Sequence, residues 1–241
     1  MIRTLFLFLA AFAVTAPATA RPPAKRNAHP TKIADWSRTV SAKADGGFVM
    51  GNPAAKVKLV EFGSLTCPHC RHFDLDGATP LIANYVRSGK VSWEFRPFLL
   101  NGYDIPATLT AACNGPASFF PMLRALYAAQ PDWIAKIQAI PADRAEAIEK
   151  MTPPQQFKTV GGVAGFPGFA AAHGVPAAKV EACLVNHPLA DRFVKATADA
   201  TNRLKVNSTP TFLVNGATVD YSGHSSAWEA VQAGLDAALK G

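Results

Sequence analysis

The chain has 241 residues, of which 49% are hydrophobic and 17% are charged. This composition is typical of a globular protein and excludes an intrinsically disordered chain or a fibrous repeat. The net charge is +7 with histidine neutral. No basic stripe interleaved with aromatic side chains accompanies that charge, so the sequence does not indicate a nucleic-acid-binding protein.

The first twenty residues have the pattern of a secretory signal peptide. Arg3 gives a positive start, Leu5 to Val14 form an apolar run, and Ala18-Thr19-Ala20 is a small-x-small cleavage site. We therefore predict that residues 1–20 are removed after Ala20 and that the protein is exported. A membrane anchor is the alternative, but the apolar run is shorter than the roughly 20 residues that span a bilayer.

The next part of the chain predicts an extension followed by a strand–helix–strand unit. Residues 21–52 indicate a Pro-rich linker and then a peripheral strand or hairpin. Residues 57–62 are β-branched and end at Gly63-Ser64, which predicts a strand. A helix is expected over residues 67–87, with Asp76-Gly77 and Pro80 bending or interrupting it. Residues 91–95 alternate apolar and polar, which predicts a second strand parallel to the first.

The remaining sequence predicts a helical block and then a return to β structure. Residues 103–202 are rich in alanine with helical spacing and several prolines, which indicates a set of short helices. Asn215-Gly216 between two apolar runs predicts a hairpin. Ser226 with Glu229 predicts the start of a final helix. We therefore expect an α/β domain formed by residues 53–102 and 203–241, with residues 103–202 inserted as a lid or cap.

The motif Cys67-Pro68-His69-Cys70 follows the first predicted strand and opens the next helix. Cys67 takes the N-cap position, and Pro68 suits the first helical position. Unpaired backbone N–H groups and the positive end of the helix dipole favour a thiolate at Cys67. We predict a redox-active disulfide in which Cys67 is the attacked sulfur and the more shielded Cys70 is the resolving sulfur. Such a disulfide needs no added cofactor.

Three other uses of a CxxC motif compete with redox chemistry. A structural zinc site pairs one CxxC with a second cluster, yet Cys113 and Cys183 stand apart in the sequence. A c-type haem site needs histidine directly after the second cysteine, where this chain has Arg71. The third is an inert structural disulfide, which so short and strained a loop disfavours. We therefore predict redox chemistry and no metal.

Two further residues are expected to assist the cysteines. His69 lies between them, where a cationic or hydrogen-bonding ring would lower the pKa of Cys67. Strand alternation puts Glu61 on the same face as Val57 and Leu59, which should be buried. A buried carboxylate is costly without a role, so Glu61 is a candidate for proton exchange with Cys70. The alternative is that Glu61 reaches solvent or pairs with a lysine.

With these residues identified, the chain resembles the DsbA-like branch of the thioredoxin superfamily. The resemblance rests on the run from Glu61 to Cys70, on Thr209-Pro210-Thr211-Phe212 near the end, and on the helical insertion between them. It covers residues 57–241 and implies a thioredoxin fold. It also implies that Pro210 is cis and packs against the Cys67–Cys70 disulfide, and that the backbone of Thr209 pairs with an extended substrate.

The resemblance further implies a role and partners. Members of the family act in the periplasm, where they oxidise thiols of newly exported proteins and are themselves reoxidised by a quinone-linked membrane protein. We expect the same here, with the protein a monomer. Thr209 departs from the valine of the best-known oxidases, which leaves a disulfide isomerase or reductase as the alternative. The short segment before the first core strand argues against the dimerisation domain of isomerases.

Two questions stay open from the sequence: the state of the other two cysteines, and whether the protein is an enzyme. Given export, Cys113 and Cys183 in the insertion are predicted to form a structural disulfide. Otherwise they are buried free thiols or a secondary redox pair. A non-enzymatic hypothesis is that the protein is a periplasmic metal carrier or holdase, which uses Cys67, Cys70 and His69 to bind a soft metal.

Overall fold

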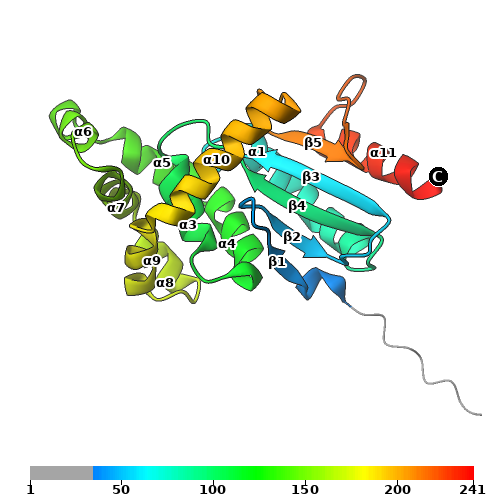
Figure 1. The fold of residues 1–241 in the computed structure, drawn as a ribbon, viewed down its shortest axis with the longest axis horizontal. Coiled ribbons are helices and arrows are strands. Elements are labelled where there is room, and N and C mark those ends of the chain that lie inside the picture. Colours follow the sequence, from blue (N-terminus) through cyan, green and yellow to red (C-terminus); the bar gives the residue numbers. More distant parts are fainter. Residues whose placement is uncertain (1–34) are drawn as a thin grey trace, which may run out of the picture. The chain divides into compact units, whose positions relative to one another are not determined.

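The computed structural model describes residues 35–241, so the predicted signal peptide and the Pro-rich start of the extension lie outside the described residues. Within residues 35–241 a six-stranded sheet has the order β1-β2-β4-β3-β5-β6. Helices pack against it and extend to one side as a separate helical block (Figure 1). The strands are β1 Val40–Ala42, β2 Phe48–Gly51, β3 Val57–Gly63, β4 Val91–Pro97, β5 Thr211–Val214 and β6 Ala217–Thr218.

The predicted strand–helix–strand unit is present, because β3 and β4 pair in parallel with a helical connection between them. The α-helix predicted over residues 67–87 is interrupted, but the interruptions are π-helical segments and the chain stays helical to Val86. Asp76-Gly77 lies within a π-helical segment, whereas Pro80 lies in a short α-helical segment between two π-helical ones. The consecutive segments of the connection are α1 Pro68–Phe73, η2 Asp74–Ala78, α2 Thr79–Leu81 and η3 Ile82–Val86.

Gly77 allows the last helix, α11 (Ala227–Lys240), to approach this connection closely. A Cβ atom at Gly77 would lie 3.0 Å from ring atoms of Phe73 and Trp228. The side chain of Trp228 therefore fills the space that any larger residue at position 77 would need. This contact fixes α11 beside the helix that begins at the Cys-Pro-His-Cys motif.

The C-terminal hairpin and the cap of α11 also follow the sequence. Asn215 and Gly216 join β5 to β6 with φ angles of 50° and 87°, the left-handed conformation that such a turn requires. The Ser226 side chain accepts a hydrogen bond from the Glu229 N–H. The Glu229 carboxylate accepts from Ser225 rather than from Ser226, so the reciprocal bond of the capping box is displaced by one residue.

The hairpin predicted in the N-terminal extension is part of the sheet. β1 forms an edge, but β2 lies between β1 and β4 and pairs with both. Phe48 and Met50 of β2 point into the core, and the Phe48 ring stacks on Phe119 with centroids 3.6 Å apart. The boundary expected at residue 53 is therefore too late, because alternation along β2 buries two apolar side chains of the supposed extension.

The inserted block is helical, as predicted, but it does not end at residue 202. Its last helix, α10 (His187–Leu204), runs from the block onto the sheet (Figure 1). There Ala200 packs with Phe62, Phe98 and Val206. One continuous helix thus belongs to both parts. The other helices of the block are α3 Asp104–Ala112, α4 Pro116–Ala128, α5 Gln130–Gln138, α6 Ala142–Glu149, α7 Pro153–Ala164, α8 Phe166–Ala172 and α9 Ala177–Leu184.

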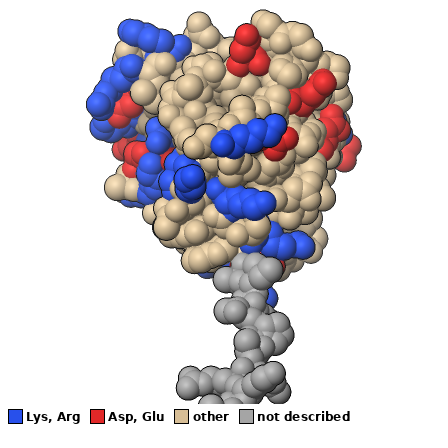
Figure 2. All heavy atoms as spheres, turned by 90° about the vertical axis from the view of Figure 1, so that its right-hand side faces the viewer, with Lys and Arg blue, Asp and Glu red and all other residues tan. Residues whose placement is uncertain are grey.

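The charged side chains are interspersed on the face that Figure 2 shows. Basic side chains spread over its left and lower parts, and acidic side chains lie among them and along the right side. Among residues 35–241, no helix combines the length and the apolar character that crossing a membrane requires.

Candidate functional site

The two cysteines of the motif lie where β3 turns into α1. Cys67 is the N-cap of α1 with an extended backbone, and Pro68 occupies the first helical position, as the sequence predicts. Cys70 is one turn further along the helix and fully buried. The two sulfurs are not bonded to each other in this structure. The local sequence thus sets one sulfur at the helix start and the other inside the core.

The surroundings of Cys67 favour a negative sulfur. The pKa of Cys67 is lowered from 9.0 to about 5, chiefly by the Cys70 thiol, and also by the Thr209 hydroxyl and the N–H groups of Cys70 and His69. These backbone groups face the sulfur without closing a formal capping hydrogen bond, so their effect is electrostatic. Burial acts in the opposite direction but is outweighed.

The environment of Cys70 has the opposite effect. Burial is the largest cause that raises the pKa of Cys70 well above its usual value, and the Cys67 sulfur and the Glu61 carboxylate add to it. The Ser64 N–H donates to the Cys70 Sγ at 3.5 Å, which offsets only part of that effect. The two sulfurs therefore differ strongly in acidity, and the proton shared between them belongs to Cys70.

A loop from the other end of the chain closes over Cys67. The Thr209–Pro210 peptide bond is cis. The Cys67 thiol donates to the Thr209 carbonyl oxygen at 3.3 Å. The buried Thr209 Oγ1 has no hydrogen-bond partner beside a neutral thiol, and it is placed to donate to a thiolate. Among the described residues nothing accepts a hydrogen bond from the Thr209 N–H.

Glu61 lies beneath the cysteines on the buried face of β3. Its side chain is 1% exposed, and Oε2 accepts a hydrogen bond from the indole of Trp93 at 3.0 Å. Burial is the main cause that raises its pKa well above 4.5, followed by the charges of Asp74 and Cys67. Glu61 does not reach solvent, and it pairs with no lysine among residues 35–241. Burial thus favours the protonated form of Glu61, which is close enough to both sulfurs to influence them.

Asp74 is a second buried acid, and the sequence analysis did not identify it. It lies four residues after Cys70 on the same face of the helical connection and is 3% exposed. Its Oδ1 is 3.6 Å from Nε of Arg124 on α4, too far for a hydrogen bond. Burial raises the pKa of Asp74 to about 6 in spite of this pairing. An acid at helical spacing among apolar residues was the signal that could have identified it.

The ring of His69 is exposed and lines a groove beside the cis proline. The groove measures about 490 Å³ and is walled by His69, His72, Phe73, Asp76, Thr209, Pro210, Tyr221, Ser225, Ser226, Ala227 and Trp228. We call it the Pro210 groove. His69 acts on the Cys67 sulfur through its backbone N–H, and within residues 35–241 its ring has no hydrogen bond to either sulfur. The predicted tuning by the imidazole ring stays a prediction.

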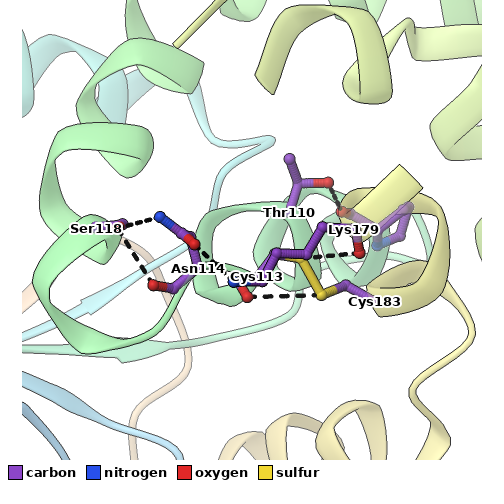
Figure 3. Close-up of a disulfide and its surroundings, with 7 residues drawn as sticks. Thr110, Cys113, Asn114, Ser118, Lys179 and Cys183 are labelled. Carbon is purple, nitrogen blue, oxygen red and sulfur yellow. Dashed lines mark hydrogen bonds between the residues drawn. A yellow bond between two sulfur atoms is a disulfide. The ribbon is translucent and has the colours of Figure 1, made fainter. Parts of the chain in front are cut away.

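Cys113 and Cys183 are joined in a disulfide within the helical block. It links the end of α3 to α9, and carbonyl oxygens surround it: Cys113 Sγ is 3.2 Å from the carbonyl oxygen of Lys179 (Figure 3). The pairing is the one that the sequence predicts. It lies in the insertion, away from the Cys-Pro-His-Cys motif at the start of α1. In the part of the chain that the structure describes, no group of three or more His, Cys, Asp or Glu residues is arranged to hold a metal ion.

Comparison with known proteins agrees with this architecture. A family model described as Thioredoxin matches residues 43–237. A crystal structure named protein-disulfide isomerase, from Novosphingobium aromaticivorans, is 30% identical and superposes with a TM-score of 0.75 over 83% of this chain and 100% of that one. The α-DsbA1 structure from Wolbachia pipientis has a TM-score of 0.63 over 80% of this chain and 90% of that one, at 18% identity, which shows a shared fold.

Curated relatives come from Rickettsia and carry the provisional name protein-disulfide oxidoreductase. The protein of Rickettsia bellii is 24% identical over 197 residues, and that of Rickettsia felis is 26% identical over 179 residues. These matches cover 81% and 74% of this chain but only 66% and 56% of the relatives. The chain thus spans less than two thirds of the length of those relatives. The family model, which matches most of the chain, and the Novosphingobium structure establish that this chain belongs to the thioredoxin family, and it shares the fold of the Wolbachia α-DsbA1 structure.

Proposed function

We propose that this protein is a periplasmic thiol–disulfide oxidoreductase that introduces disulfides into exported proteins through Cys67 and Cys70. The observation that carries the proposal is the position of the Cys67 sulfur at a helix start, where its pKa falls to about 5. A thiolate stabilised in this way favours the reduced enzyme. The oxidised Cys67–Cys70 disulfide is then a strong oxidant of other thiols.

The first step is attack by a client thiolate on Cys67 of the oxidised enzyme. The Cys67–Cys70 bond breaks, a mixed disulfide forms between the client and Cys67, and Cys70 leaves with the electron pair. Because the Cys70 thiolate is buried and disfavoured, it takes a proton, and the nearby donor is Glu61, whose protonated form is favoured by burial.

The second step releases the product. Another thiolate of the client attacks the client sulfur of the mixed disulfide, and Cys67 leaves as a stabilised thiolate. The client has lost two electrons and gained a disulfide, and the enzyme is left reduced. A quinone-linked membrane oxidase then accepts these electrons and restores the Cys67–Cys70 bond. The disulfide itself is the redox group, so this cycle uses no further cofactor.

Client recognition combines backbone pairing with an adjoining groove. Among residues 35–241 nothing accepts a hydrogen bond from the Thr209 N–H, and the same residue's carbonyl oxygen contacts the Cys67 sulfur, which suits pairing with a client backbone in extended conformation. The Pro210 groove continues from this position. The clients are exported proteins with free thiols that are still folding, and the enzyme binds them as a monomer.

A redox titration against glutathione and a client assay test this function together. For the proposed oxidase we expect an oxidising potential for the Cys67–Cys70 couple and rapid oxidation of reduced, unfolded ribonuclease. A reducing couple that leaves ribonuclease thiols intact would contradict it. Export is tested separately: periplasmic extracts should contain a mature chain that begins at Arg21. Membranes with added quinone should reoxidise the reduced enzyme.

A disulfide isomerase is the second candidate. Two observations favour it: the structural relative from Novosphingobium is named protein-disulfide isomerase, and Thr209 contacts the Cys67 sulfur. Scrambled ribonuclease separates the two functions, because an isomerase restores its activity without an added oxidant and a dedicated oxidase does not. Retention of a soft metal through purification, with no dithiol oxidation, would instead indicate the metal carrier.

A further inference from the structure

The segment Ser64–Cys67 carries the first cysteine but has no regular secondary structure of its own. Its backbone groups are largely buried, so each needs a hydrogen-bond partner. The sheet supplies few of these partners. Three side chains of the helical insertion supply most of the others, and all three are buried: Asp104, Tyr127 and Gln130.

Asp104, the first residue of α3, holds two loops together. Its Oδ1 accepts from Ser64 Oγ at 2.8 Å and from the Thr66 N–H at 2.9 Å. Its Oδ2 accepts from Thr66 Oγ1 at 3.1 Å and from the N–H groups of Leu100 and Asn101 at 2.8 and 3.3 Å. The residue is fully buried. All of its acceptor capacity is thus used to join the segment before Cys67 to the loop after β4.

Gln130 and Tyr127 hold the carbonyl groups of the same segment. Gln130, at the start of α5, donates through Nε2 to the Leu65 oxygen at 2.7 Å and to the Cys67 oxygen at 3.0 Å. The Tyr127 hydroxyl of α4 donates to the Ser64 oxygen at 3.1 Å. Among residues 35–241 the Leu65 oxygen accepts from no other group, so removing the Gln130 donor would leave that carbonyl group unsatisfied.

The groups held in this way are the ones that orient the two sulfurs. The Ser64 N–H donates to the Cys70 Sγ, and the Ser64 oxygen accepts from the Cys67 N–H at 3.2 Å. The Cys67 oxygen also accepts the first hydrogen bond of α1, from the Arg71 N–H. A small rotation of the segment would turn the Cys67 sulfur away from the helix start. The insertion therefore does more than cover the site.

We propose that Asp104 and Gln130 are positioning residues, through which the helical insertion sets the thiolate stability of Cys67 and hence the redox poise of the pair. This inference rests on the proposed function in one respect: the redox poise of the pair affects activity only if the pair oxidises client thiols. It replaces the lid expected from the sequence with a structural support that acts on the reactive sulfur. Neither residue touches a substrate or takes part in bond exchange.

The test is a titration of the Cys67 thiolate, followed by its ultraviolet absorbance, in the full-length mature protein and three variants. Asp104→Asn keeps the shape but places an amide donor opposite hydrogen-bond donors. Gln130→Leu removes both donated bonds at similar volume. Thr110→Val is the control: Thr110 is equally buried in α3, and within the described part of the chain its hydroxyl bonds only to the Pro106 oxygen of the same helix.

We expect the Cys67 pKa to rise by about one unit in D104N and Q130L, and to stay unchanged in T110V. The equilibrium constant with glutathione should shift about tenfold toward the oxidised enzyme, which corresponds to about 30 mV. Unchanged titration in folded D104N and Q130L, or an equal shift in T110V, would overturn the proposal. If D104N fails to fold, Thr66→Val removes one bond to Asp104, and an unshifted Cys67 in T66V counts equally against it.

This outcome is independent of the proposed function. The titration compares each variant with the wild type and needs no client. A wild type that fails to oxidise ribonuclease would defeat the proposed function, even where the variants shift the Cys67 pKa as expected.

Discussion

The protein holds two pairs of cysteines whose sulfurs meet opposite ends of helices. Cys67 lies at the start of α1, where backbone N–H groups face its sulfur. Cys113 is the C-cap of α3, and its sulfur lies near the carbonyl oxygen of Lys179. The positive end of a helix stabilises a thiolate and the negative end does not. Two cysteine sulfurs thus form a reactive pair at the start of α1 and a structural disulfide at the end of α3.

The two pairs also differ in the loop that each closes. Two residues separate Cys67 from Cys70, so their bond restricts the unfolded chain very little. Cys113 and Cys183 are 70 residues apart, so the loop that their disulfide closes includes most of the helical insertion. Loop-closure entropy rises with the number of residues enclosed. The difference suggests that one pair serves electron transfer and the other serves stability.

The largest expected effect is the loss of dithiol oxidation when the reactive pair, rather than the structural pair, is substituted. Cys67→Ser should abolish oxidation of a reduced dithiol peptide, by at least about a thousandfold, because no other sulfur can form the mixed disulfide. The double variant C113S/C183S should retain the wild-type rate within about twofold. The initial rate of peptide oxidation measures both. Comparable losses in the two variants would abolish the distinction between the pairs.

The second prediction concerns stability, for which the Cys113–Cys183 pair should matter more than the Cys67–Cys70 pair. C113S/C183S should lower the free energy of unfolding by about 4 kcal/mol, the chain-entropy value for a loop of this length. Reducing only the Cys67–Cys70 disulfide should not lower this free energy, because the stabilised Cys67 thiolate favours the reduced folded protein. Urea titration of both forms provides the measurement. A double variant as stable as the wild type would show that the insertion does not depend on its disulfide.

The third prediction concerns Asp74, a buried acid next to the reactive pair. Its pKa is raised to about 6 from 3.8, so the folded state holds the proton more tightly than the unfolded state does. Stability is then lost as the pH rises from about 4 to above 6, at a cost of up to about 3 kcal/mol. Asp74→Asn avoids this loss. The variant should be more stable than the wild type at about pH 8 and similar to it at about pH 4.

A matched control separates burial from charge removal. Asp76 lies two residues further along and is exposed. Asp76→Asn should therefore leave the unfolding free energy nearly unchanged at both pH values. Thermal unfolding monitored by circular dichroism is sufficient for the series. A D74N variant that gains nothing at the higher pH would mean that Arg124 compensates the buried charge fully.

The fourth prediction concerns proton transfer at the reactive pair. Glu61→Gln removes the acid that supplies a proton to Cys70, and the first exchange step should slow by up to about a hundredfold, the low end for general acid catalysis. Glu94→Gln is the control, because Glu94 lies on the other face of the sheet and pairs with Lys43 and Arg96. Stopped-flow reduction of the oxidised enzyme measures the step. Equal rates in E61Q and wild type would remove Glu61 from the mechanism.

Much of the fold could be predicted from local patterns. Alternation located β3 and β4, Asn215-Gly216 located the last hairpin, and Ser226 marked the start of α11. The boundaries were less predictable because they depend on long-range packing. Phe48 pairs with Phe95 in the sheet, and its ring stacks on Phe119 of the insertion, which is 71 residues away in sequence.

The site divides in the same way. Cys67, Cys70 and Glu61 could be predicted because a motif and a strand period place them within ten residues of one another. Asp104 and Gln130 could not, because they act on backbone atoms far away in the sequence. A hydrogen bond from a side chain to a distant carbonyl leaves no periodic signal. The contacts that orient the sulfurs therefore became visible only in three dimensions.

The most direct test of the central claim is the acidity of Cys67 in the reduced wild-type protein. Thiolate absorbance should be titrated with C67S as the blank, which removes the signal of the reactive sulfur alone. We expect a pKa of about 5. A value near 9.0, the ordinary value for a thiol, would contradict it, since the helix start would then confer no special reactivity on this sulfur.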